Sequence, residues 1–323
     1  MAVSPASGVR TAVPDDLPAL RALAADSLHW DADAAELVDL LWPTTDTEFA
    51  LVDEVDGAVV GLALGSLGPE PRDPVAARRG HVNLLAVGPE VRRQGHATAL
   101  LQAMERRLGQ VGAGDVLIGG ATPRFAWPGI DVRYTAATCF AEARGYVRQR
   151  EAVNMTVELD AAAAAGRLAT ELDEKRLAEH RITVRKLTEA DRARITPWLA
   201  TWGGTWREET LSTLNEAAAG RNGTTGTYVA VLRDGAADAE YVGFASYGVN
   251  RRDWFGPMGT GGELRKLGIG SVLLRRCLND MRELGRLRTA QIGWVGPIGF
   301  YARTVDAYLE RVYWMYRRDR SAS

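Results

Sequence analysis

A short element occurs twice in this chain, 173 residues apart, and it constrains the fold more than any other feature. The first copy reads Arg92-Arg93-Gln94-Gly95-His96-Ala97 and continues with Thr98. The second reads Arg265-Lys266-Leu267-Gly268-Ile269-Gly270 and continues with Ser271. Each follows an extended run and opens an amphipathic helix, so several backbone N–H groups and a helix N-terminus point at one place. The sequence therefore predicts two anion-binding turns of a kind that suits a diphosphate.

The duplication extends well beyond these turns. Val9-Arg10 with Asp16 matches Val184-Arg185 with Asp191. Each half also has two expected strands joined by an Asp-Gly turn. In a chain of 323 residues this indicates two copies of a unit of roughly 150 residues rather than a short-period repeat. We expect domains at 1–160 and 182–323, and a helical or stiff linker at 161–181 because that segment is rich in alanine and alternating charge. A disordered tether is the alternative for this segment.

Composition excludes several classes of function. The chain is 46% hydrophobic and 25% charged, with a formal net charge of −2. Without an excess of basic residues, a nucleic-acid partner is not expected. No apolar run reaches the length of a membrane span and no signal-peptide pattern occurs, so we expect a cytoplasmic protein. The cysteines, Cys139 and Cys277, are expected to be buried free thiols, and four scattered histidines predict no metal site.

Hydrophobic periodicity predicts an α/β arrangement in each half. In the first half, helices are expected at 15–26, 33–41, 95–108 and 135–144, and strands at 49–52, 59–64, 80–87, 116–120 and 153–159. The second half repeats this order and ends with a strand at 311–316. We expect each half to keep its own final strand.

The order of these motifs resembles the GNAT superfamily of acyl-CoA-dependent N-acetyltransferases, in its tandem two-domain actinobacterial type. The resemblance rests on the basic turn, the Leu-Leu helix after it and a late helix that ends at glycine. It implies two tandem GNAT-like domains, each a mixed, mostly antiparallel sheet flanked by helices. It also implies acetyl-CoA as the donor, with its diphosphate on Arg92, Arg93, Gln94, Gly95, His96, Ala97 and Thr98 or on Arg265, Lys266, Leu267, Gly268, Ile269, Gly270 and Ser271. Its pantetheine arm would pair with the strand Leu85, Ala86 and Val87, or with Met258, Gly259 and Thr260.

The same resemblance assigns the chemistry to the second half. There Tyr301 follows Phe300 on the late helix, at the position of the family's general acid, whereas the first half has Phe140-Ala141 and lacks the tyrosine. A proton donor near a leaving thiolate typically contributes 10²–10⁴-fold in rate. The alternative for Tyr301 is an aromatic residue of the core.

The base that takes the proton of the attacking amine is less well defined by the sequence. Asp253 is the first candidate, with Glu263 behind it, and a plain surface carboxylate remains the alternative for Asp253. In the first half, His81 and Tyr134 are the corresponding candidates.

Together these features predict an enzyme that transfers an acetyl group from acyl-CoA to a primary amine of a small molecule, such as an amino sugar, an antibiotic or a natural-product intermediate. Attack would be direct, in a ternary complex. Two alternatives stay open: chemistry in the first half, and an acyl-CoA-binding sensor or scaffold without turnover. A long segment at 121–139 would cover the amine or brace the domains, and Trp198, Trp202 and Trp206 would pack in a core or interface or line the substrate. The sequence does not define the oligomeric state.

Overall fold

The computed structural model describes residues 8–71, 76–120, 125–203, 205–218, 224–262 and 264–319. Its internal contacts divide the chain into two compact units. The N-terminal unit comprises Met1–Ala152 together with Val312–Ser323, and the C-terminal unit comprises Val153–Arg311. Among the described residues, no helix has the length and apolar character that crossing a bilayer requires.

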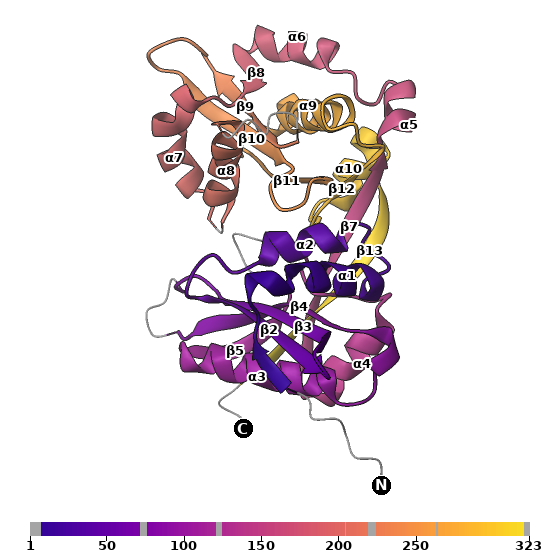
Figure 1. Cartoon of the computed structure of the whole chain (residues 1–323). Coiled ribbons are helices and arrows are strands. Elements are labelled where there is room, and N and C mark those ends of the chain that lie inside the picture. The colour runs from indigo at the N-terminus through magenta and orange to yellow at the C-terminus, as the bar shows by residue number, and fades with distance from the viewer. Residues whose placement is uncertain are drawn as a thin grey trace. The chain divides into compact units, whose positions relative to one another are not determined.

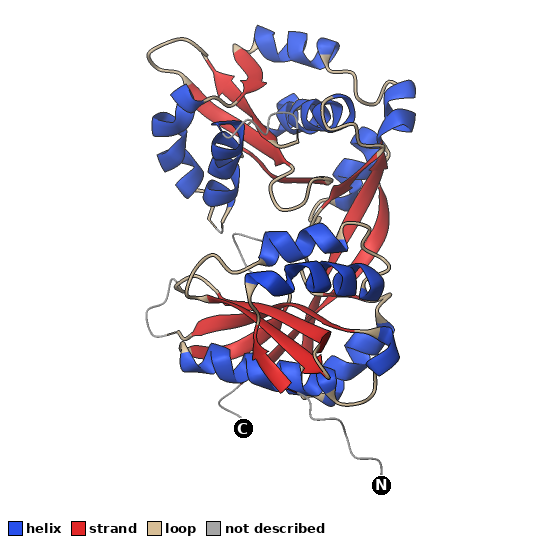
Figure 2. Ribbon diagram, viewed as in Figure 1, coloured by secondary structure: helices blue, strands red, loops and turns tan. Residues whose placement is uncertain are grey.

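The N-terminal unit is a twisted sheet with helices on both faces (Figures 1 and 2). Its strands follow the order β1-β2-β3-β4-β5-β13, antiparallel except for β4 with β5. Its elements are β1 (Gly8–Thr11), α1 (Leu17–Ser27), α2 (Ala34–Leu41), β2 (Glu48–Val55), β3 (Ala58–Leu67), β4 (Arg78–Val87), α3 (His96–Gln110), β5 (Ala113–Ile118), β6 (Ile130–Asp131) and α4 (Thr135–Ala143).

The C-terminal unit repeats this plan in the order β8-β9-β10-β11-β12-β7, with β11 and β12 parallel. Its elements are α5 (Leu159–Ala164), α6 (Glu171–Glu179), β8 (Ile182–Lys186), α7 (Arg192–Ala200), α8 (Trp206–Ala218), β9 (Gly226–Leu232), β10 (Glu240–Tyr247), β11 (Trp254–Thr260), α9 (Ile269–Glu283), β12 (Thr289–Ile292) and α10 (Ile298–Val305). The two mixed, mostly antiparallel sheets flanked by helices agree with the fold predicted from the sequence.

The final strands of the two halves are exchanged. β7 (Val147–Glu158) ends in the C-terminal unit, where Met155 lies opposite Ile292 of β12. β13 (Tyr308–Asp319) ends in the N-terminal unit, where Tyr316 lies opposite Ile118 of β5. Both strands were predicted, but each half was expected to keep its own. Alternating apolar residues define which face of a strand is buried but not which sheet the strand joins, so the pattern did not specify the partner.

The segment predicted as a linker forms two helices that pack within the C-terminal unit. α5 and α6 both lie against α9. Arg276 of α9 holds Glu174 of α6 through two hydrogen bonds of 2.6 Å, and Asn279 donates to the carbonyl of Leu168 at 2.9 Å. The helical prediction for this segment is confirmed, and its tertiary contacts make it part of a domain.

Each face of the N-terminal sheet carries its own apolar core. On one face, α1 and α2 contribute buried leucines such as Leu20 and Leu37. On the other, α3 contributes Leu100, Met104 and Leu108 at helical spacing. Because side chains of a strand alternate between faces, the same strands supply both cores. The strands of this sheet therefore lie between two layers of helices.

The duplicated Arg–Asp pairs make matching hydrogen bonds in the two units. Asp16 accepts hydrogen bonds from Arg10 and from the backbone of Val13. Asp191 accepts them from Arg185 and from the backbone of Thr188. Each carboxylate thus ties the first strand of its unit to the start of the first helix, where an acidic group also favours the helix dipole.

The exchange predicts that a substitution near the end of the chain destabilises the N-terminal unit. Tyr313 of β13 is fully buried in the core that contains Leu20 and Leu37. Tyr313→Ala should cost about 3–5 kcal/mol, since it removes a large core side chain. Hydrogen exchange should show lost protection in peptides of α1 and β3.

Tyr308→Ala is the matched control, because Tyr308 lies on the same strand and is 45% exposed. We expect a change well below 1 kcal/mol for this surface position. Equal effects of the two substitutions, or lost protection confined to the C-terminal unit, would contradict the exchange.

Candidate functional site

The site of the N-terminal unit begins where two parallel strands part. β4 and β5 pair from Arg78 to Val82, and the bond from Gly119 N–H to the carbonyl of Val82, at 2.8 Å, closes this pairing. β5 ends at Ile118, whereas β4 continues to Val87. The last part of β4 therefore presents an open backbone edge.

The backbone of Leu85 and Val87 faces this open edge. β3 and β4 shift register around Asn83, which is one residue in excess on β4. Beyond this bulge, Gly88 N–H donates to the carbonyl of Val60 on β3 at 2.9 Å. Because successive residues of a strand turn their backbone groups to opposite sides, Leu85 and Val87 turn theirs away from β3. An extended ligand can add to the sheet here.

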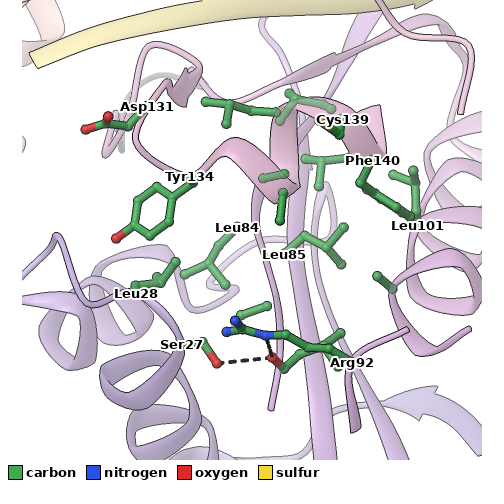
Figure 3. A pocket seen from close by; sticks show the side chains of 18 of the residues that line it. Ser27, Leu28, Leu84, Leu85, Arg92, Leu101, Asp131, Tyr134, Cys139 and Phe140 are labelled. Carbon is green, nitrogen blue, oxygen red and sulfur yellow. Dashed lines mark hydrogen bonds between the residues drawn. The ribbon is translucent and has the colours of Figure 1, made fainter. Parts of the chain in front are cut away.

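Two side chains already use the carbonyl of Val87. Ser27 of α1 donates to it from Oγ at 3.3 Å, and Arg92 donates from Nε at 3.2 Å (Figure 3). Arg92 thus joins the end of the strand to the turn that follows. Leu85, Ala86 and Val87 were predicted to pair with the pantetheine arm. Because Ala86 faces β3 and the carbonyl of Val87 already accepts from two side chains, Leu85 is the residue of this set best placed to pair with a ligand.

The turn after β4 has the geometry of an anion cradle. Arg93 and Gly95 have positive φ angles of 67° and 100°, and α3 begins at His96. The N–H groups of the first helical turn have no partner within the helix, and the helix dipole adds partial positive charge there. A Cβ atom at Gly95 would meet no atom within 4 Å, so the space above the turn is open. These features fit a diphosphate.

The His96 side chain has a structural role in this turn. Its Nδ1 lies 2.8 Å from Oδ2 of Asp53 on β2, and both residues are buried. This contact fixes the first residue of α3 to the sheet. His96 was predicted to bind the cofactor, and the described contacts limit that role to its backbone. Ile269 occupies the matching, fully buried position in the C-terminal unit.

A cavity of about 890 Å³ joins the turn to the open edge of β4 and continues to a polar cluster. Figure 3 shows Leu84 and Leu85 along the cavity, Arg92 at one end and Tyr134 toward the other. Apolar side chains make up most of the wall between these ends. One connected space can therefore hold an anion, an extended arm and a polar group together.

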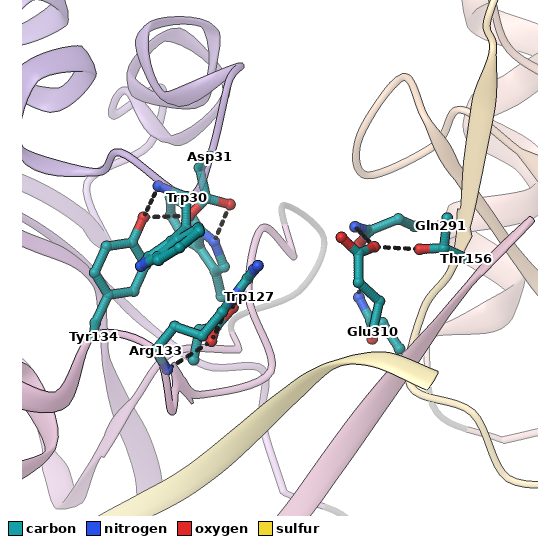
Figure 4. Close-up of polar contacts among 10 residues, drawn as sticks. Trp30, Asp31, Trp127, Arg133, Tyr134, Thr156, Gln291 and Glu310 are labelled. Carbon is teal, nitrogen blue, oxygen red and sulfur yellow. Dashed lines mark hydrogen bonds and ion pairs between the residues drawn. The ribbon is translucent and has the colours of Figure 1, made fainter. Parts of the chain in front are cut away.

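Asp31 organises the polar cluster, which we define as Asp31, Trp127 and Tyr134. Asp31 is 4% exposed and accepts hydrogen bonds from Trp127 Nε1 at 3.1 Å and from the Tyr134 hydroxyl at 2.9 Å. The backbone N–H of Trp30 donates to the Tyr134 oxygen at 3.0 Å (Figure 4). These two hydrogen bonds orient the carboxylate of Asp31.

A second acidic group beside the cluster is paired with arginine. Arg133 donates from Nε and Nη2 to Asp131, at 3.1 and 2.8 Å, and its guanidinium lies 4.8 Å from the ring centre of Trp30. Asp131 and Arg133 also line the cavity. Their bidentate pairing makes this part of the wall rigid and nearly neutral in net charge.

The sequence offered His81 and Tyr134 as candidates for proton transfer in this unit, and Tyr134 lines the cavity. His81 is not part of its lining as the described residues define it. His81 Nδ1 lies 2.9 Å from the carbonyl of Gly119, and burial lowers the pKa of its imidazole. A neutral His81 then donates to Gly119 and braces the point where β4 and β5 part.

The cysteines differ from each other. Cys277 is buried as expected, and burial raises the pKa of its thiol. Cys139, predicted to be buried, is exposed and lines the cavity from α4. The apolar pattern around Cys139 belongs to a short helix whose buried face runs through Thr138 and Ala141 instead.

The C-terminal unit repeats the backbone geometry of the turn and strand. Gly268 has a positive φ of 86°, a Cβ there would meet no atom within 4 Å, and α9 follows. Gly261 N–H donates to the carbonyl of Val242 at 2.9 Å, so by the same alternation Met258 and Thr260 face the open edge and Gly259 faces β10. Beside the turn, a Cβ on Gly270 would lie 3.6 Å from the Phe300 ring.

The predicted catalytic residues of this unit occupy different environments. Tyr301 is 7% exposed and packs edge to face on Phe255 and Phe300, and burial raises the pKa of its phenol to about 12. Asp253 lies just before β11, where its carbonyl accepts from Gln291 N–H, and its carboxylate lies 3.8 Å from Arg251 Nε. Asp253 therefore sits on the paired part of the strand. Glu263 lies outside the described residues.

The remaining aromatic predictions have clear positions. Trp198, Trp202 and Trp206 pack around Phe244 in one core of the C-terminal unit, which confirms their core reading. Of the long segment at 121–139, the part from residue 125 onward is described, and Trp127 in it lines the cavity of the N-terminal unit.

Comparisons with known proteins agree with this geometry. Residues 17–122 match the model of the acetyltransferase (GNAT) family. No curated protein matches the chain significantly. A GCN5-related glucosamine N-acetyltransferase region of a fungal multi-domain β-N-acetylglucosaminidase superposes with a TM-score of 0.77 at 16% identity, over 98% of this chain and 38% of that one. This chain thus spans well under half of that protein's length.

Two further structures match over nearly their full length. A GNAT protein from Sphaerobacter thermophilus has a TM-score of 0.65 and 20% identity, over 97% of this chain and 95% of that one. A tandem GNAT protein from the clavulanic acid biosynthesis pathway has a TM-score of 0.66 and 15% identity, over 97% and 98%. The molecule thus has an acetyltransferase fold in two copies. Residues 17–122 match the model of the GNAT family, whose members use acetyl-CoA as acyl donor, and the whole chain has the tandem GNAT fold.

Substitution of the cradle glycines should count the acetyl-CoA sites. Gly95→Glu places a carboxylate where the diphosphate is expected, and like charges brought together cost several kcal/mol. We expect acetyl-CoA affinity at the first cradle to fall about 100-fold or more, and Gly268→Glu to do the same at the second. Isothermal calorimetry on each full-length variant measures affinity and stoichiometry.

Gly57→Glu controls for backbone strain in this experiment. Gly57 has a φ of 81°, and a Cβ there would also meet no atom within 4 Å. It lies in the turn between β2 and β3, so its substitution should leave acetyl-CoA affinity unchanged. If neither cradle variant alters affinity or stoichiometry, the cradle assignment is wrong.

Proposed function

We propose that this protein is an acetyl-CoA-dependent N-acetyltransferase for a small primary amine, and that its N-terminal unit carries out the transfer. One observation carries the proposal: a single cavity connects the anion cradle, the open edge of β4 and the cluster of Asp31, Trp127 and Tyr134. Such a connected space suits the two substrates of direct transfer. The cradle glycine with open space above it supports the fit of the coenzyme.

In this proposal the backbone binds the donor. The cradle from Arg92 to Thr98 holds the diphosphate, and Leu85 pairs with the pantetheine arm along β4. Acetyl-CoA supplies an acetyl thioester. The open backbone edge near the bulge at Asn83 offers N–H groups for the oxyanion that forms on its carbonyl oxygen.

Asp31 lies at the end of the cavity where the acceptor amine would approach the thioester. Its carboxylate is buried and held by Trp127 and Tyr134, so it needs little rearrangement when the substrate arrives. The ammonium loses one proton to solvent, and the amine nitrogen forms its bond to the carbonyl carbon. The nitrogen then loses a second proton, and the carbon–sulfur bond breaks as the sulfur takes a proton from Tyr134, which the second proton from nitrogen restores. Products are the amide and the coenzyme thiol.

Tyr134 is the proposed donor to the departing sulfur. The N–H of Trp30, which donates to the phenol oxygen, stabilises negative charge that develops there. This role falls to Tyr134 because Phe140 and Ala141, on α4 of the same unit, have no hydroxyl.

The assignment of chemistry to the C-terminal unit is the competing proposal. It is supported by the second cradle and by Tyr301, whose raised pKa keeps the phenol protonated at neutral pH. Against it stand the burial of Tyr301 among Phe255 and Phe300, and the position of Asp253 beside Arg251. In this reading the N-terminal unit would bind acyl-CoA without turnover.

A panel of amines distinguishes enzyme from sensor. Glucosamine is included first, because a similar structure is described as a glucosamine N-acetyltransferase region. An aminoglycoside, an amino acid and n-propylamine extend the panel to other classes. Release of coenzyme thiol with a product mass raised by one acetyl group supports transfer. Tight acetyl-CoA binding without any product supports a sensor.

A pair of conservative tyrosine substitutions tests which unit reacts. Tyr134→Phe keeps the ring contact with His29 and removes the donor, so turnover should fall by roughly 10²-fold or more with acetyl-CoA affinity retained. Tyr301→Phe keeps the core packing, and its turnover should stay close to that of the unsubstituted protein. Steady-state kinetics with the best amine of the panel provide the measurement.

The opposite result would contradict the assignment of catalysis to the N-terminal unit. A Tyr301→Phe protein that loses turnover, beside an active Tyr134→Phe protein, moves the chemistry to the C-terminal unit. Loss in both variants would mean that both units react.

A further inference from the structure

Two arginines of the N-terminal cavity differ from most others in this unit. Arg93, in the cradle turn, and Arg144, at the end of α4, both line the cavity and both are exposed. Arg10, Arg21 and Arg133 each form an ion pair with a carboxylate. Within the part of the chain that the structure describes, neither Arg93 nor Arg144 has a carboxylate within ion-pair distance.

The placement of these two side chains points to a common ligand. Arg93 follows Arg92 directly and adopts a positive φ of 67°, a conformation uncommon for a residue with a side chain. Arg144 lies with its guanidinium 5.9 Å from the ring centre of Phe140, which also lines the cavity. Arg93, in the turn before α3, and Arg144, at the end of α4, therefore both bring positive charge to this cavity.

This positive charge exceeds what a diphosphate needs. Backbone N–H groups and the dipole of α3 already meet the diphosphate at the cradle. Two further guanidinium groups suit a separate phosphate, which carries close to two negative charges and accepts bidentate hydrogen bonds. Coenzyme A has one such group, the 3′-phosphate of its ribose.

We propose that Arg93 and Arg144 form a subsite for the 3′-phosphate, which makes the N-terminal unit select coenzyme A over dephospho-coenzyme A. This inference rests on the proposed binding of acetyl-CoA in the same cavity. Selection here means a difference in affinity between two ligands that differ by one phosphate group.

The C-terminal unit lacks half of this arrangement. Lys266 occupies the position of Arg93 in the second turn. Where α4 ends in Arg144 followed by Gly145 with positive φ, α10 ends in Val305 followed by Asp306 with positive φ. The second unit thus has valine in place of Arg144, and the aspartate after it forms an ion pair with Arg167 at 2.8 Å.

The test compares the binding of two ligands to full-length protein that carries Gly268→Glu. This substitution blocks the second cradle, so that binding at the first cradle alone is measured. Calorimetry gives the affinities for coenzyme A and dephospho-coenzyme A. We expect coenzyme A to bind about 10-fold to 100-fold more tightly, the range for charge-assisted hydrogen bonds. Arg144→Gln and Arg93→Gln should each remove most of this preference by weakening coenzyme A alone.

Arg106→Gln is the matched control for overall charge. Arg106 is exposed on α3, outside the cavity lining. Its substitution should leave the preference for coenzyme A unchanged. An equal weakening of both ligands by Arg144→Gln would mean a general electrostatic effect and would overturn the subsite.

Each remaining outcome separates this inference from the proposed function. Equal affinity of the Gly268→Glu protein for the two ligands overturns the subsite and leaves acetyl transfer standing. A clear preference for coenzyme A in a protein that acetylates no amine supports the subsite and overturns the proposed enzyme. If neither ligand binds at the first cradle, both proposals are wrong.

Discussion

The parting of β4 and β5 after Val82 is the constraint on which the rest of the N-terminal unit depends. Parallel strands that stayed paired would use every backbone group and leave no edge. Here Gly119 closes the pairing, the bulge at Asn83 redirects the backbone, and β4 runs on alone toward the cradle. The helices on the two faces pack on separate apolar cores, so this part of the sheet lies between two helical layers.

Much of the fold followed from patterns that are local in the sequence. The turns at Gly95 and Gly268 were predictable because a helix that begins after a left-handed residue strongly favours glycine there. The helices and most strands followed from their periodicity. The exchange of β7 and β13 did not, because alternation defines which residues face a core but not which sheet the strand joins.

The site was predictable at its cradle and less so at its polar end. Asp31 meets Trp127 and Tyr134 across about a hundred residues of sequence, and a lone aspartate between two helices gives no periodic or spacing signal. Tyr134 was one of two candidates for proton transfer in the first half, and the sequence did not distinguish it from His81. Cys139 was misjudged for a related reason: on a short helix, a shift of one residue, about 100° of rotation, decides whether a side chain faces the core or a cavity.

The exchanged strands also bear on how the protein is made. Trp314 and Tyr313 pair with Ile130 and Asp131, which line the N-terminal cavity. Gly129, beside them, fits only because it has no side chain: a Cβ there would lie 2.4 Å from the Trp314 carbonyl oxygen. During translation, this strand leaves the ribosome after both units have been synthesised. The wall of the first cavity therefore stays incomplete on the nascent chain, and a ribosome that stops early releases a protein with neither a finished sheet nor a finished binding site.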